Sequence, residues 1–501
     1  MSRAIGSVRR FVARHPDALA LLIIGVVAGL LRLAFLYRAP VLLTGDSQSH
    51  FLPGFDLVRG YAFDPELRRP PGYAAFVAGV ITLLGEDLRA LAFAQHLLGI
   101  GAALLTYGLG RLTFGRAAGL AGGLLVALNG SLILSGQSVM TETLFTALLL
   151  GTLVLLLVAG RSGRLAWCLA AGLLLGAAVL TRPVAQLLVP LVPLAFLLYS
   201  RRPGHVVRGT MLVGVGALLL VGPWTLRNLS EHGTLSAAGG LGRSLVARTV
   251  KYDEAFFDTD RPAADDDLKG QVRQFIRGKR NTIRKSRSVR STQTGLMKEF
   301  GLTQAQSDRL MRDAAIEAIM ERPGYYVVGS LRMAGQIAVG KVEEDTLSER
   351  WLLRRDKDWV EQWEARIDHL IQPSSMAEQR EQGRAQALAN IFQPATFGAT
   401  LPVLALAGLV AAIWYRPALL PGLAGLGILL ASAALDGPVP RYRYPLDPLI
   451  ALFAAGAVTT LAVVAWRVVR RPSRSAGVVL PGDAPAMGRV PGPATAAEAS
   501  R

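Results

Sequence analysis

The sequence predicts an all-α protein that crosses a membrane many times. Of its 501 residues, 51% are hydrophobic, and long apolar runs with almost no charge lie at 18–36, 144–159, 165–180 and 184–198. A helix satisfies its own backbone hydrogen bonds in lipid, and about 20 apolar residues are needed to cross the hydrocarbon core. Short basic loops separate several of the runs, as is typical of polytopic membrane proteins.

The first apolar run is expected to be a retained span rather than a cleaved signal. No small-residue cleavage site follows it, whereas Arg38, Pro40 and further apolar residues do. The formal net charge of +18 favours contact with anionic lipid or phosphate groups, but a chain so committed to the bilayer is not expected to bind nucleic acid. Cys168 is the only cysteine, which excludes a disulfide within the chain and a thiolate metal site.

The distribution of Lys and Arg predicts which span ends lie in the cytoplasm. Short basic loops stay on the cytoplasmic side, so the amino-terminal arm and the loops at 111–116, 161–164 and 201–208 are expected inside. All of these loops fall on the cytoplasmic side if the short apolar stretch 73–84 lies along the outer surface instead of crossing the membrane. The resulting topology has about ten or more spans. They lie near 18–36, 88–109, 117–134, 143–160, 165–181, 183–199, 207–222, 397–415, 417–435 and 445–466.

The same parity brings polar residues from distant parts of the sequence to the outer face. Asp46 follows the first span, and the outer span ends include 140–142, 181–183 and 223–228. The polar segment 229–394 is expected to be mainly external, with amphipathic helices over the outer mouth of the bundle. Within it, 325–339 is left open as one more embedded segment. The tail 472–501 is rich in Pro, Ala and Gly and is expected to be disordered.

Several short motifs lie on this expected outer face. The first external loop contains Gly45-Asp46-Ser47-Gln48-Ser49-His50 and, further on, Arg68-Arg69-Pro70-Pro71-Gly72-Tyr73. Thr141-Glu142 opens an apolar run, Leu-Thr-Arg-Pro ends at Pro183, Pro223-Trp224 is followed by Arg227-Asn228, and Arg441-Tyr442-Arg443-Tyr444-Pro445 comes before the last span. In this order and spacing the motifs resemble the GT-C superfamily of membrane glycosyltransferases, closest to its protein O-mannosyltransferase and aminoarabinose transferase branch. The resemblance extends over 18–230 and 395–466.

The resemblance implies a GT-C-type transmembrane bundle with external juxtamembrane helices. It divides the chain into a catalytic transmembrane module at 1–228 with its first external loop at 38–87, an external helical segment at 229–394, carboxyl-terminal spans at 395–471 and the tail. Such enzymes take a sugar from a polyprenyl-phosphate carrier on the non-cytoplasmic side. The implied partners are that donor, membrane lipids and an acceptor glycan, lipid or protein, in a multi-pass protein of a prokaryotic plasma membrane.

Displacing phosphate from an anomeric carbon requires a base for the incoming hydroxyl. Asp46 stands at the position of the family's first-loop acid and is the expected general base of an inverting transfer. Many relatives have a second acid beside the first, where this chain has Ser47, which leaves room for His50 or Glu142 to share the role. Glu142 is equally well explained as a partner of its helix dipole. Asp46, His50 and Glu142 also form a candidate site for a divalent metal ion, which some GT-C enzymes use.

Arginine suits the leaving group because negative charge grows on the phosphate oxygens as the bond breaks. Arg69 and Arg441 are the first choices for binding the donor phosphate. The full set of candidates, all expected near the outer surface, is Arg69, Arg182, Arg227, Arg441 and Arg443. Arginine at a span end is also explained by contact with lipid headgroups, so only part of this set is expected to bind. The basic run 269–290 is expected to be a solvated loop.

The main alternative is a transporter or flippase of lipid-linked sugars. That class predicts ionisable residues near the middle of several spans, often with broken helices. Here the charges gather at the outer span ends, and the span interiors are nearly free of charge. A scaffold protein would not need an acid and several arginines on one face. The sequence therefore favours the enzyme.

Overall fold

A computed structural model describes residues 14–39, 41–43, 46–61, 67–252, 268–285, 289–340 and 400–469. Within these ranges the regular structure is helical, and the one extended pairing is a parallel bridge between Leu42 and Ser138. The chain divides into two compact units, Met1–Leu461 and Ala462–Arg501. All contacts described below lie within the first unit. The predictions made for the segment 341–399 and for the tail 472–501 lie outside the described part of the chain.

Several helices are long and apolar enough to cross a membrane. In the described residues there are six: α2 (Pro16–Arg38), α5 (Leu88–Thr113), α8 (Glu142–Ser162), α11 (Pro203–His232), the stretch formed by η4 (Arg416–Ala418) and α22 (Leu419–Leu435), and α23 (Asp447–Val469). The number rises to seven when α6 (Arg116–Ala127) and α7 (Gly130–Gln137), which meet at 51°, are taken as one broken span. These findings confirm the predicted all-α polytopic membrane protein.

The other expected spans coincide with shorter apolar helices. These are α9 (Leu165–Thr181), η1 (Pro183–Leu191) continued by α10 (Val192–Leu197), and α21 (Thr400–Ala411). The stretch expected along the outer surface forms α4 (Gly72–Leu84), which has 13 residues. At 1.5 Å per residue such a helix is about 20 Å long, too short for a hydrocarbon core of about 30 Å. The number of about ten spans stays a prediction.

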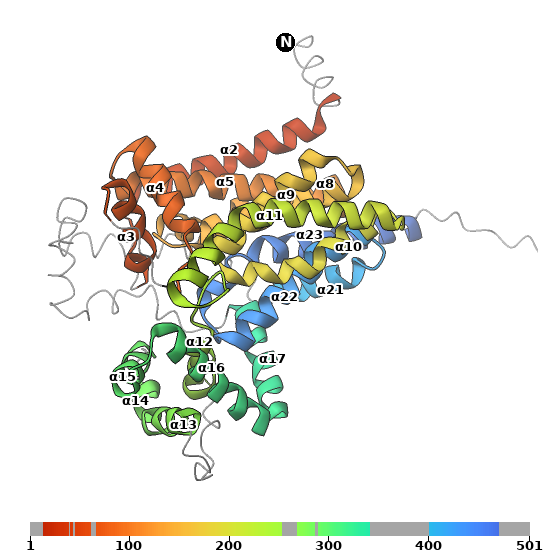
Figure 1. Cartoon of the computed structure of the whole chain (residues 1–501). Coiled ribbons are helices and arrows are strands. Elements are labelled where there is room, and N and C mark those ends of the chain that lie inside the picture. The colour runs from red at the N-terminus through yellow and green to blue at the C-terminus, as the bar shows by residue number, and fades with distance from the viewer. Residues whose placement is uncertain are drawn as a thin grey trace, which may run out of the picture. The chain divides into compact units, whose positions relative to one another are not determined.

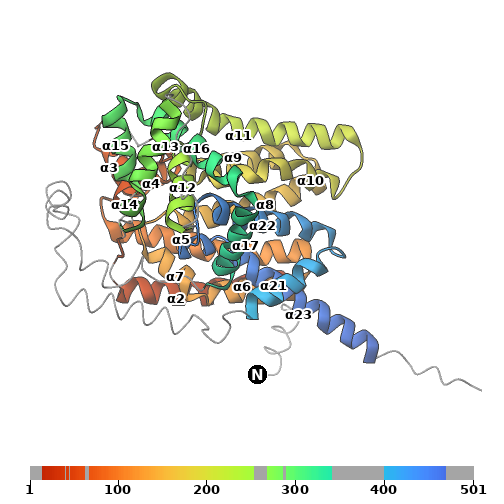
Figure 2. The same cartoon turned by 90° about the horizontal axis from the view of Figure 1, so that it is seen from below.

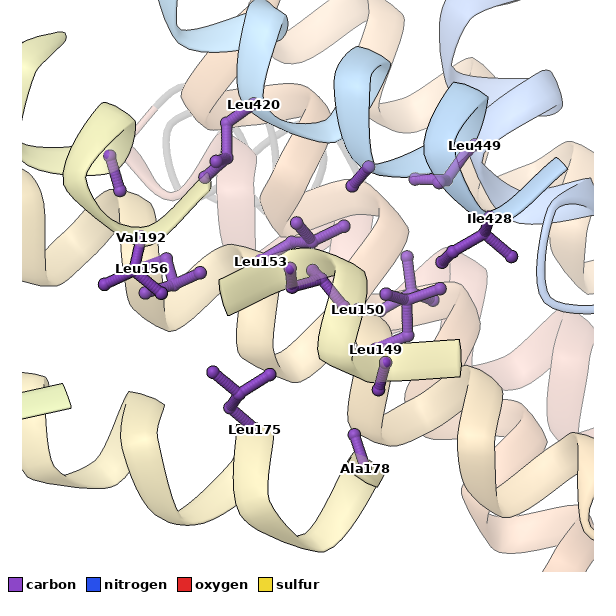
Figure 3. Close-up of a cluster of buried hydrophobic side chains, with 14 of the residues drawn as sticks. Leu149, Leu150, Leu153, Leu156, Leu175, Ala178, Val192, Leu420, Ile428 and Leu449 are labelled. Carbon is purple, nitrogen blue, oxygen red and sulfur yellow. The ribbon is translucent and has the colours of Figure 1, made fainter. Parts of the chain in front are cut away.

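The largest hydrophobic core surrounds α8, whose leucines face α9, α10, α22 and α23 (Figure 3). Leu149, Leu150 and Leu153 of α8 are fully buried. Small residues bring neighbouring helices into backbone contact: a Cβ on Gly216 of α11 would lie 2.6 Å from the carbonyl oxygen of Leu169 in α9. Close approach through glycine is a common way for helices to associate in membranes.

One end of the bundle is joined by ion pairs around Asp17 at the start of α2. Its carboxylate accepts from Arg116 at 2.6 Å and lies 3.3 Å from Arg111, and the hydroxyl of Tyr107 donates to it at 2.6 Å. The start of α2 therefore lies beside the turn between α5 and α6. The charge pattern predicts these two segments on the same side of the membrane, and the structure places them together.

One charge does lie inside a span. Arg32 of α2 is fully buried and donates to the carbonyl oxygens of Ala127 at 3.1 Å and Val126 at 3.4 Å. These carbonyls lie at the end of α6, at its break before α7, and that of Val126 also accepts from the N–H of Asn129 at 3.3 Å. Arg32 therefore satisfies the backbone of a broken helix, which is a structural use of a buried charge.

The described part of the segment predicted to be external includes a group of helices with a core of its own (Figures 1 and 2). In order they are α12 (Leu241–Val246), η2 (Ala247–Tyr252), α13 (Leu268–Gly278), α14 (Arg280–Lys285), α15 (Arg290–Phe300) and α16 (Gln304–Glu321). The next helix, α17 (Pro323–Val339), instead buries Met333, Ala334 and Ile337 in the core around α8. The expectation of a solvated loop at 269–290 is wrong for α13 and α14. Val272 and Ile276, one turn apart, bury the apolar face of α13, and Arg273 pairs with Glu317 at 3.5 Å.

Candidate functional site

Segments from five parts of the sequence meet around Asp46, which immediately precedes α3 (Ser47–Val58). An Asp at this position usually accepts a hydrogen bond from the first turn of its helix. The Asp46 side chain makes no such bond, and the hydroxyl of Ser49 instead donates to the Asp46 carbonyl at 2.9 Å. The carboxylate of Asp46 is therefore available to groups outside its own helix.

Two arginines hold the Asp46 carboxylate. Arg69 Nη2 donates to Oδ1 at 3.2 Å from the loop before α4, and Arg441 Nη2 donates to Oδ2 at 2.6 Å from η5 (Pro440–Arg443). A second carboxylate lies next to this pair. Glu142, the first residue of α8, accepts from Arg182 Nη1 at 2.9 Å and lies 3.7 Å from Arg441 Nε. We call Asp46, Arg69, Glu142, Arg182 and Arg441 the charged cluster.

The charged cluster is buried on one side and open on the other. The Glu142 side chain is 2% exposed, whereas that of Asp46 is 39% exposed. Arg182 lies at the end of α9, with its Cζ 5.8 Å from the ring centre of Phe145 and 5.3 Å from that of Tyr442. Ion pairs between partly buried groups are screened less by salt than surface pairs. The cluster is thus a fixed, charged surface that remains reachable from solvent.

The charges of the cluster set the protonation of its members. Burial raises the pKa of Asp46, but the guanidinium charges of Arg441 and Arg69 outweigh burial and hold that pKa well below its usual range. Burial and the neighbouring Arg69 also lower the pKa of His50 well below its ordinary value. Burial opposes the charge of Arg441, yet Asp46 and Glu142 raise its pKa. Near neutral pH Asp46 is therefore charged, and His50 beside the cluster is neutral.

Two arginines predicted as donor-phosphate ligands lie outside the charged cluster. Arg227 pairs with Glu231 at 2.5 Å, and its Cζ lies 4.8 Å from the ring centre of Trp224. Arg443 donates to Asp447 at 2.7 Å. Each pairs with an acid four residues further along the chain. Of the five predicted arginines, the structure brings Arg69, Arg182 and Arg441 together.

The structure adds residues that the sequence reasoning missed. Asp436 follows α22 and accepts a hydrogen bond from the Tyr442 hydroxyl. The charges of Arg441, Arg68 and Arg182 act on Asp436, and those of Arg441 and Arg68 also act on Asp46. Its signal in the sequence was an acid at a span end just before the Arg-Tyr-Arg-Tyr-Pro motif. Within the described residues, four arginines (Arg68, Arg69, Arg182 and Arg441) surround three carboxylates (Asp46, Glu142 and Asp436).

The arrangement does not fit the metal site considered for Asp46, His50 and Glu142. The described part of the chain contains no group of three or more His, Cys, Asp or Glu residues placed to hold a metal ion. Each oxygen of Asp46 faces a guanidinium, and Glu142 accepts from Arg182. Cationic neighbours repel a divalent cation and favour an anion. The chemistry of this donor set therefore points to an anionic ligand.

The segment from Gly239 to Asp308 contacts the loop that carries Arg68 and Arg69. The backbone N–H of Gly239 donates to the Leu67 carbonyl at 2.9 Å. In the next turn, Asp308 of α16 accepts from the N–H groups of Gly240 at 3.0 Å and Arg243 at 3.1 Å. A Cβ on Gly240, where φ is +97°, would lie 2.7 Å from Arg68 Cγ. Glycine at this position therefore permits close contact between the external segment and the arginine loop.

A neutral polar network lies beside the charged cluster, and we call it the amide cluster. It consists of Tyr73, Gln95, His96, Gln137 and Ser138, all buried. The Tyr73 hydroxyl donates to Gln95 at 2.8 Å, Gln95 Nε2 donates to the Ser138 carbonyl at 2.8 Å, and His96 bonds Gln137 at 2.8 Å.

The amide cluster fixes the segment that leads to Asp46. Gln137 Nε2 donates to the Ala39 carbonyl at 2.9 Å, and the backbone of Leu42 bonds to Gln137 and Val139 at 3.0 Å each. Tyr73 belongs to the Arg-Pro-Pro-Gly-Tyr motif, and Val139 lies three residues before Glu142. The network therefore ties together three parts of the chain that carry residues of the charged cluster.

Comparison with known proteins identifies a family over part of the chain. Residues 68–226 match the family model described as dolichyl-phosphate-mannose-protein mannosyltransferase. No curated protein matches the chain by sequence. The family match includes Arg69, Glu142 and Arg182 of the charged cluster, and it confirms the resemblance to GT-C glycosyltransferases that the motifs indicated.

Solved structures show a distant likeness. The Archaeoglobus fulgidus oligosaccharyltransferase in complex with Zn and sulfate is 12% identical with a TM-score of 0.42, and the match covers 90% of this chain and 50% of that one. ArnT from Cupriavidus metallidurans bound to undecaprenyl phosphate is 14% identical with a TM-score of 0.37, covering 91% of this chain and 81% of that one. This chain thus spans about half the length of the archaeal enzyme. The chain is a multi-pass membrane protein, and its residues 68–226 match the family model of the dolichyl-phosphate-mannose-protein mannosyltransferases.

Proposed function

We propose that this protein transfers a sugar from a polyprenyl-phosphate-linked donor to an acceptor hydroxyl, with inversion at the anomeric carbon. The proposal places the charged cluster on the non-cytoplasmic face of a prokaryotic plasma membrane. The acceptor is a hydroxyl of a glycan, a lipid or a protein. The family match over 68–226 supports the reaction class, and the surplus of arginine around Asp46 is the observation that carries the substrate class.

A site with more guanidinium groups than carboxylates fits a monoanionic phosphodiester. Four arginines and three carboxylates leave one positive charge uncompensated among the described residues of the site. A polyprenyl-phospho-sugar carries one negative charge on its phosphate. Arginine presents forked donors that match phosphate oxygens, and its charge is permanent. The cluster is therefore suited to bind the donor phosphate and to stabilise the second negative charge that develops as the phosphate leaves.

The proposed reaction forms one bond and breaks one bond at the anomeric carbon. The acceptor oxygen attacks this carbon as the bond to the phosphate oxygen breaks, and the leaving polyprenyl phosphate takes the electron pair. The acceptor proton passes to the carboxylate of Asp46, the proposed general base. The products are the new glycoside and a polyprenyl phosphomonoester, and the proton on Asp46 is then released to solvent through its exposed side.

The ion pairs of Asp46 require the donor to change its environment before it can act as a base. In the ligand-free site Arg441 and Arg69 hold the pKa of Asp46 well below its usual range. A carboxylate with so low a pKa is a weak proton acceptor. When the donor phosphate shares the two guanidinium groups, their effect on Asp46 weakens and its pKa rises. Donor binding and base activation are thus coupled through the same two arginines.

In this proposal Glu142 and His50 position groups of the site and do not act as the base. Glu142 is buried and contacts Arg182 and Arg441, so we assign to it the positioning of those arginines. This use agrees with its place at the start of α8, where a carboxylate also favours the helix dipole. His50 is neutral beside the arginines and is available as a hydrogen-bond partner for a substrate.

The test is transfer from a radiolabelled polyprenyl-phospho-sugar pool in membranes, with the natural chain compared with Asp46→Asn at matched expression. Asp56→Asn, in the same helix α3, is the matched control because Asp56 is not part of the charged cluster. Loss of a general base is expected to lower transfer by about 10²- to 10⁴-fold while donor binding persists.

The other outcomes separate the parts of the proposal. Undiminished transfer by Asp46→Asn removes Asp46 from the mechanism but leaves the enzyme in place. No transfer by the natural chain with any donor in the pool contradicts the enzyme itself. That result would favour the transporter or flippase.

A further inference from the structure

Asp436 differs from the other carboxylates of the site in its partners. Asp46 and Glu142 both accept from arginine, whereas the side-chain partner of Asp436 among the described residues is the Tyr442 hydroxyl, which donates to Oδ2. Asp436 is nevertheless within reach of the charges of Arg441, Arg68 and Arg182. A neutral donor occupies one of its oxygens, and the second oxygen remains for a ligand.

The position of Asp436 has no explanation in the stability of its helix. It follows the last residue of α22, and its N–H donates to the Ser432 carbonyl at 3.2 Å. The carboxyl end of a helix carries partial negative charge, so a carboxylate there is unfavourable. Burial also raises the pKa of Asp436, against the opposing charge of Arg441. A partly buried acid at an unfavourable helix end is a candidate for a ligand-binding role.

The backbone between Asp436 and Tyr442 is built to bring the two side chains together. Gly437 has a φ of +123°, and a Cβ there would lie 2.6 Å from the ring of Tyr252. The chain therefore reverses in close contact with η2, and η5 returns Tyr442 to Asp436. The Tyr442 ring in turn lies 5.3 Å from the guanidinium carbon of Arg182. Tyr442 thus links Asp436 to an arginine of the charged cluster.

We propose that Asp436 accepts a hydrogen bond from a hydroxyl of the transferred sugar and that Tyr442 orients its carboxylate. This inference rests on the proposed function. The sugar is bonded directly to the phosphate, so a group that faces the phosphate-binding arginines is next to the sugar ring. The flexible polyprenyl chain offers no hydroxyl, and a phosphate oxygen would be repelled by a carboxylate. A ring hydroxyl is the donor group that fits this place.

The test compares, for each of three proteins, the affinities for two lipids. The probes are polyprenyl phosphate and the polyprenyl-phospho-sugar that the natural chain binds most tightly from a set of hexosyl and pentosyl lipids. The proteins are the natural full-length chain, Asp436→Asn and Tyr442→Phe, purified in lipid nanodiscs. Asparagine keeps the shape of the side chain, and phenylalanine keeps the ring next to Arg182 while removing the hydroxyl.

We expect Asp436→Asn to weaken binding of the sugar-bearing lipid by about tenfold, because it replaces a hydrogen bond to a charged acceptor. Binding of polyprenyl phosphate should not weaken, since that probe has no sugar for Asp436 to contact and the variant only removes a carboxylate that repels the phosphate. Tyr442→Phe should cause a smaller loss in the same direction, about threefold, again confined to the sugar-bearing lipid.

Each remaining result contradicts a defined statement. Equal weakening for both lipids assigns Asp436 to the phosphate site or to the fold and overturns the sugar contact. Unchanged affinity of Asp436→Asn for the sugar-bearing lipid also overturns the sugar contact. This holds even if a transfer assay shows a raised KM for the acceptor. If the natural chain binds neither lipid, the proposed function itself fails, which is distinguishable from both results.

Discussion

The charged cluster and the amide cluster lie side by side but differ in charge balance and in exposure. The amide cluster is neutral and buried, and Gln95, Gln137 and Ser138 bond to one another's segments at 2.8–3.1 Å. The charged cluster is partly exposed and has a surplus of arginine. A neutral network of buried hydrogen bonds fixes a backbone, because every buried donor that loses its partner costs free energy. A surplus of one charge leaves binding capacity that an anion can use.

The comparison teaches that burial and hydrogen bonding alone do not identify a functional site. Both clusters are rich in polar side chains, and both contain residues from the motifs of the sequence. The difference is charge balance and exposure: Asp46 is 39% exposed, whereas Gln95, His96 and Gln137 are fully buried. Variants of the charged cluster should therefore change binding and catalysis, and variants of the amide cluster should change stability.

After Asp46→Asn, the largest effect is expected from Arg441→Gln. Arg441 contacts both Asp46 and Glu142, and in the proposed mechanism it meets the charge of the leaving phosphate. Loss of one such donor typically lowers the catalytic rate by about 10²- to 10³-fold. The transfer rate from a saturating polyprenyl-phospho-sugar is the measurement.

Arg227→Gln is the matched control for this substitution. Arg227 pairs with Glu231 away from the cluster, and such i,i+4 pairs contribute only about 0.3–0.5 kcal/mol. Its transfer rate should stay within about threefold of the natural chain. Similar losses in both variants would contradict the distinction between arginines inside and outside the cluster.

The second effect concerns the amide cluster. Gln137→Leu removes the bonds to His96 and to the Ala39 carbonyl and leaves those groups unsatisfied in a buried place. The expected loss is about 2 kcal/mol in the free energy of unfolding. Thermal unfolding of the purified protein measures it, with Arg441→Gln beside it. A larger loss of stability in Arg441→Gln than in Gln137→Leu would contradict the assignment of stability to the amide cluster and of binding to the charged cluster.

The sequence contained most of the information needed to assemble the charged cluster. Charge parity of the loops predicted that Asp46, Glu142 and Arg182 lie at one face, and the Arg-Pro-Pro and Arg-Tyr-Arg-Tyr-Pro motifs supplied Arg69 and Arg441. Span direction determines which helix ends meet, so topology alone can bring these residues together. The contacts among these residues agree with the expected convergence, and the side of the membrane on which they lie stays a prediction.

Local ion pairs separate two of the five candidate arginines from the charged cluster. Arg227 and Arg443 each have an acid four residues later, Glu231 and Asp447, and both bind it. Side chains at this spacing face each other on a helix, so the spacing was a usable signal. Asp436 was overlooked because it has no motif of its own. Its importance comes from the turn at Gly437 and from arginines in distant segments, neither of which a linear pattern contains.

The third effect is a gain of affinity. Asp46 occupies guanidinium groups that the donor phosphate needs, so Asp46→Asn removes an internal competitor. Although this variant should lose transfer, its affinity for polyprenyl phosphate should rise by about tenfold, equivalent to about 1.4 kcal/mol. Equilibrium binding at pH 7.5 in nanodiscs is the measurement, with Asp56→Asn as control. Unchanged or weaker binding would mean that Asp46 and the phosphate do not share Arg69 and Arg441.

The smallest effect is expected from pH acting on the free enzyme. Burial and Arg69 keep the pKa of His50 well below its ordinary value, and Arg441 and Arg69 overcome burial to keep that of Asp46 well below its own. A lowered pKa leaves the histidine neutral and the carboxylate charged, so neither group changes protonation between about pH 5.5 and 7.5. The profile of kcat/KM, which reports groups in the free enzyme, should be flat there with a phosphodiester donor.

The profile of kcat reports the enzyme–donor complex and should differ in a defined direction. If the donor phosphate takes over Arg69 and Arg441, the pKa of Asp46 rises in the complex, and kcat falls on the acid side as Asp46 becomes protonated. The acid limb of kcat should then lie at higher pH than that of kcat/KM. Coincident limbs would show that the donor leaves the ion pairs of Asp46 intact, and the charged cluster would then be as static as the amide cluster.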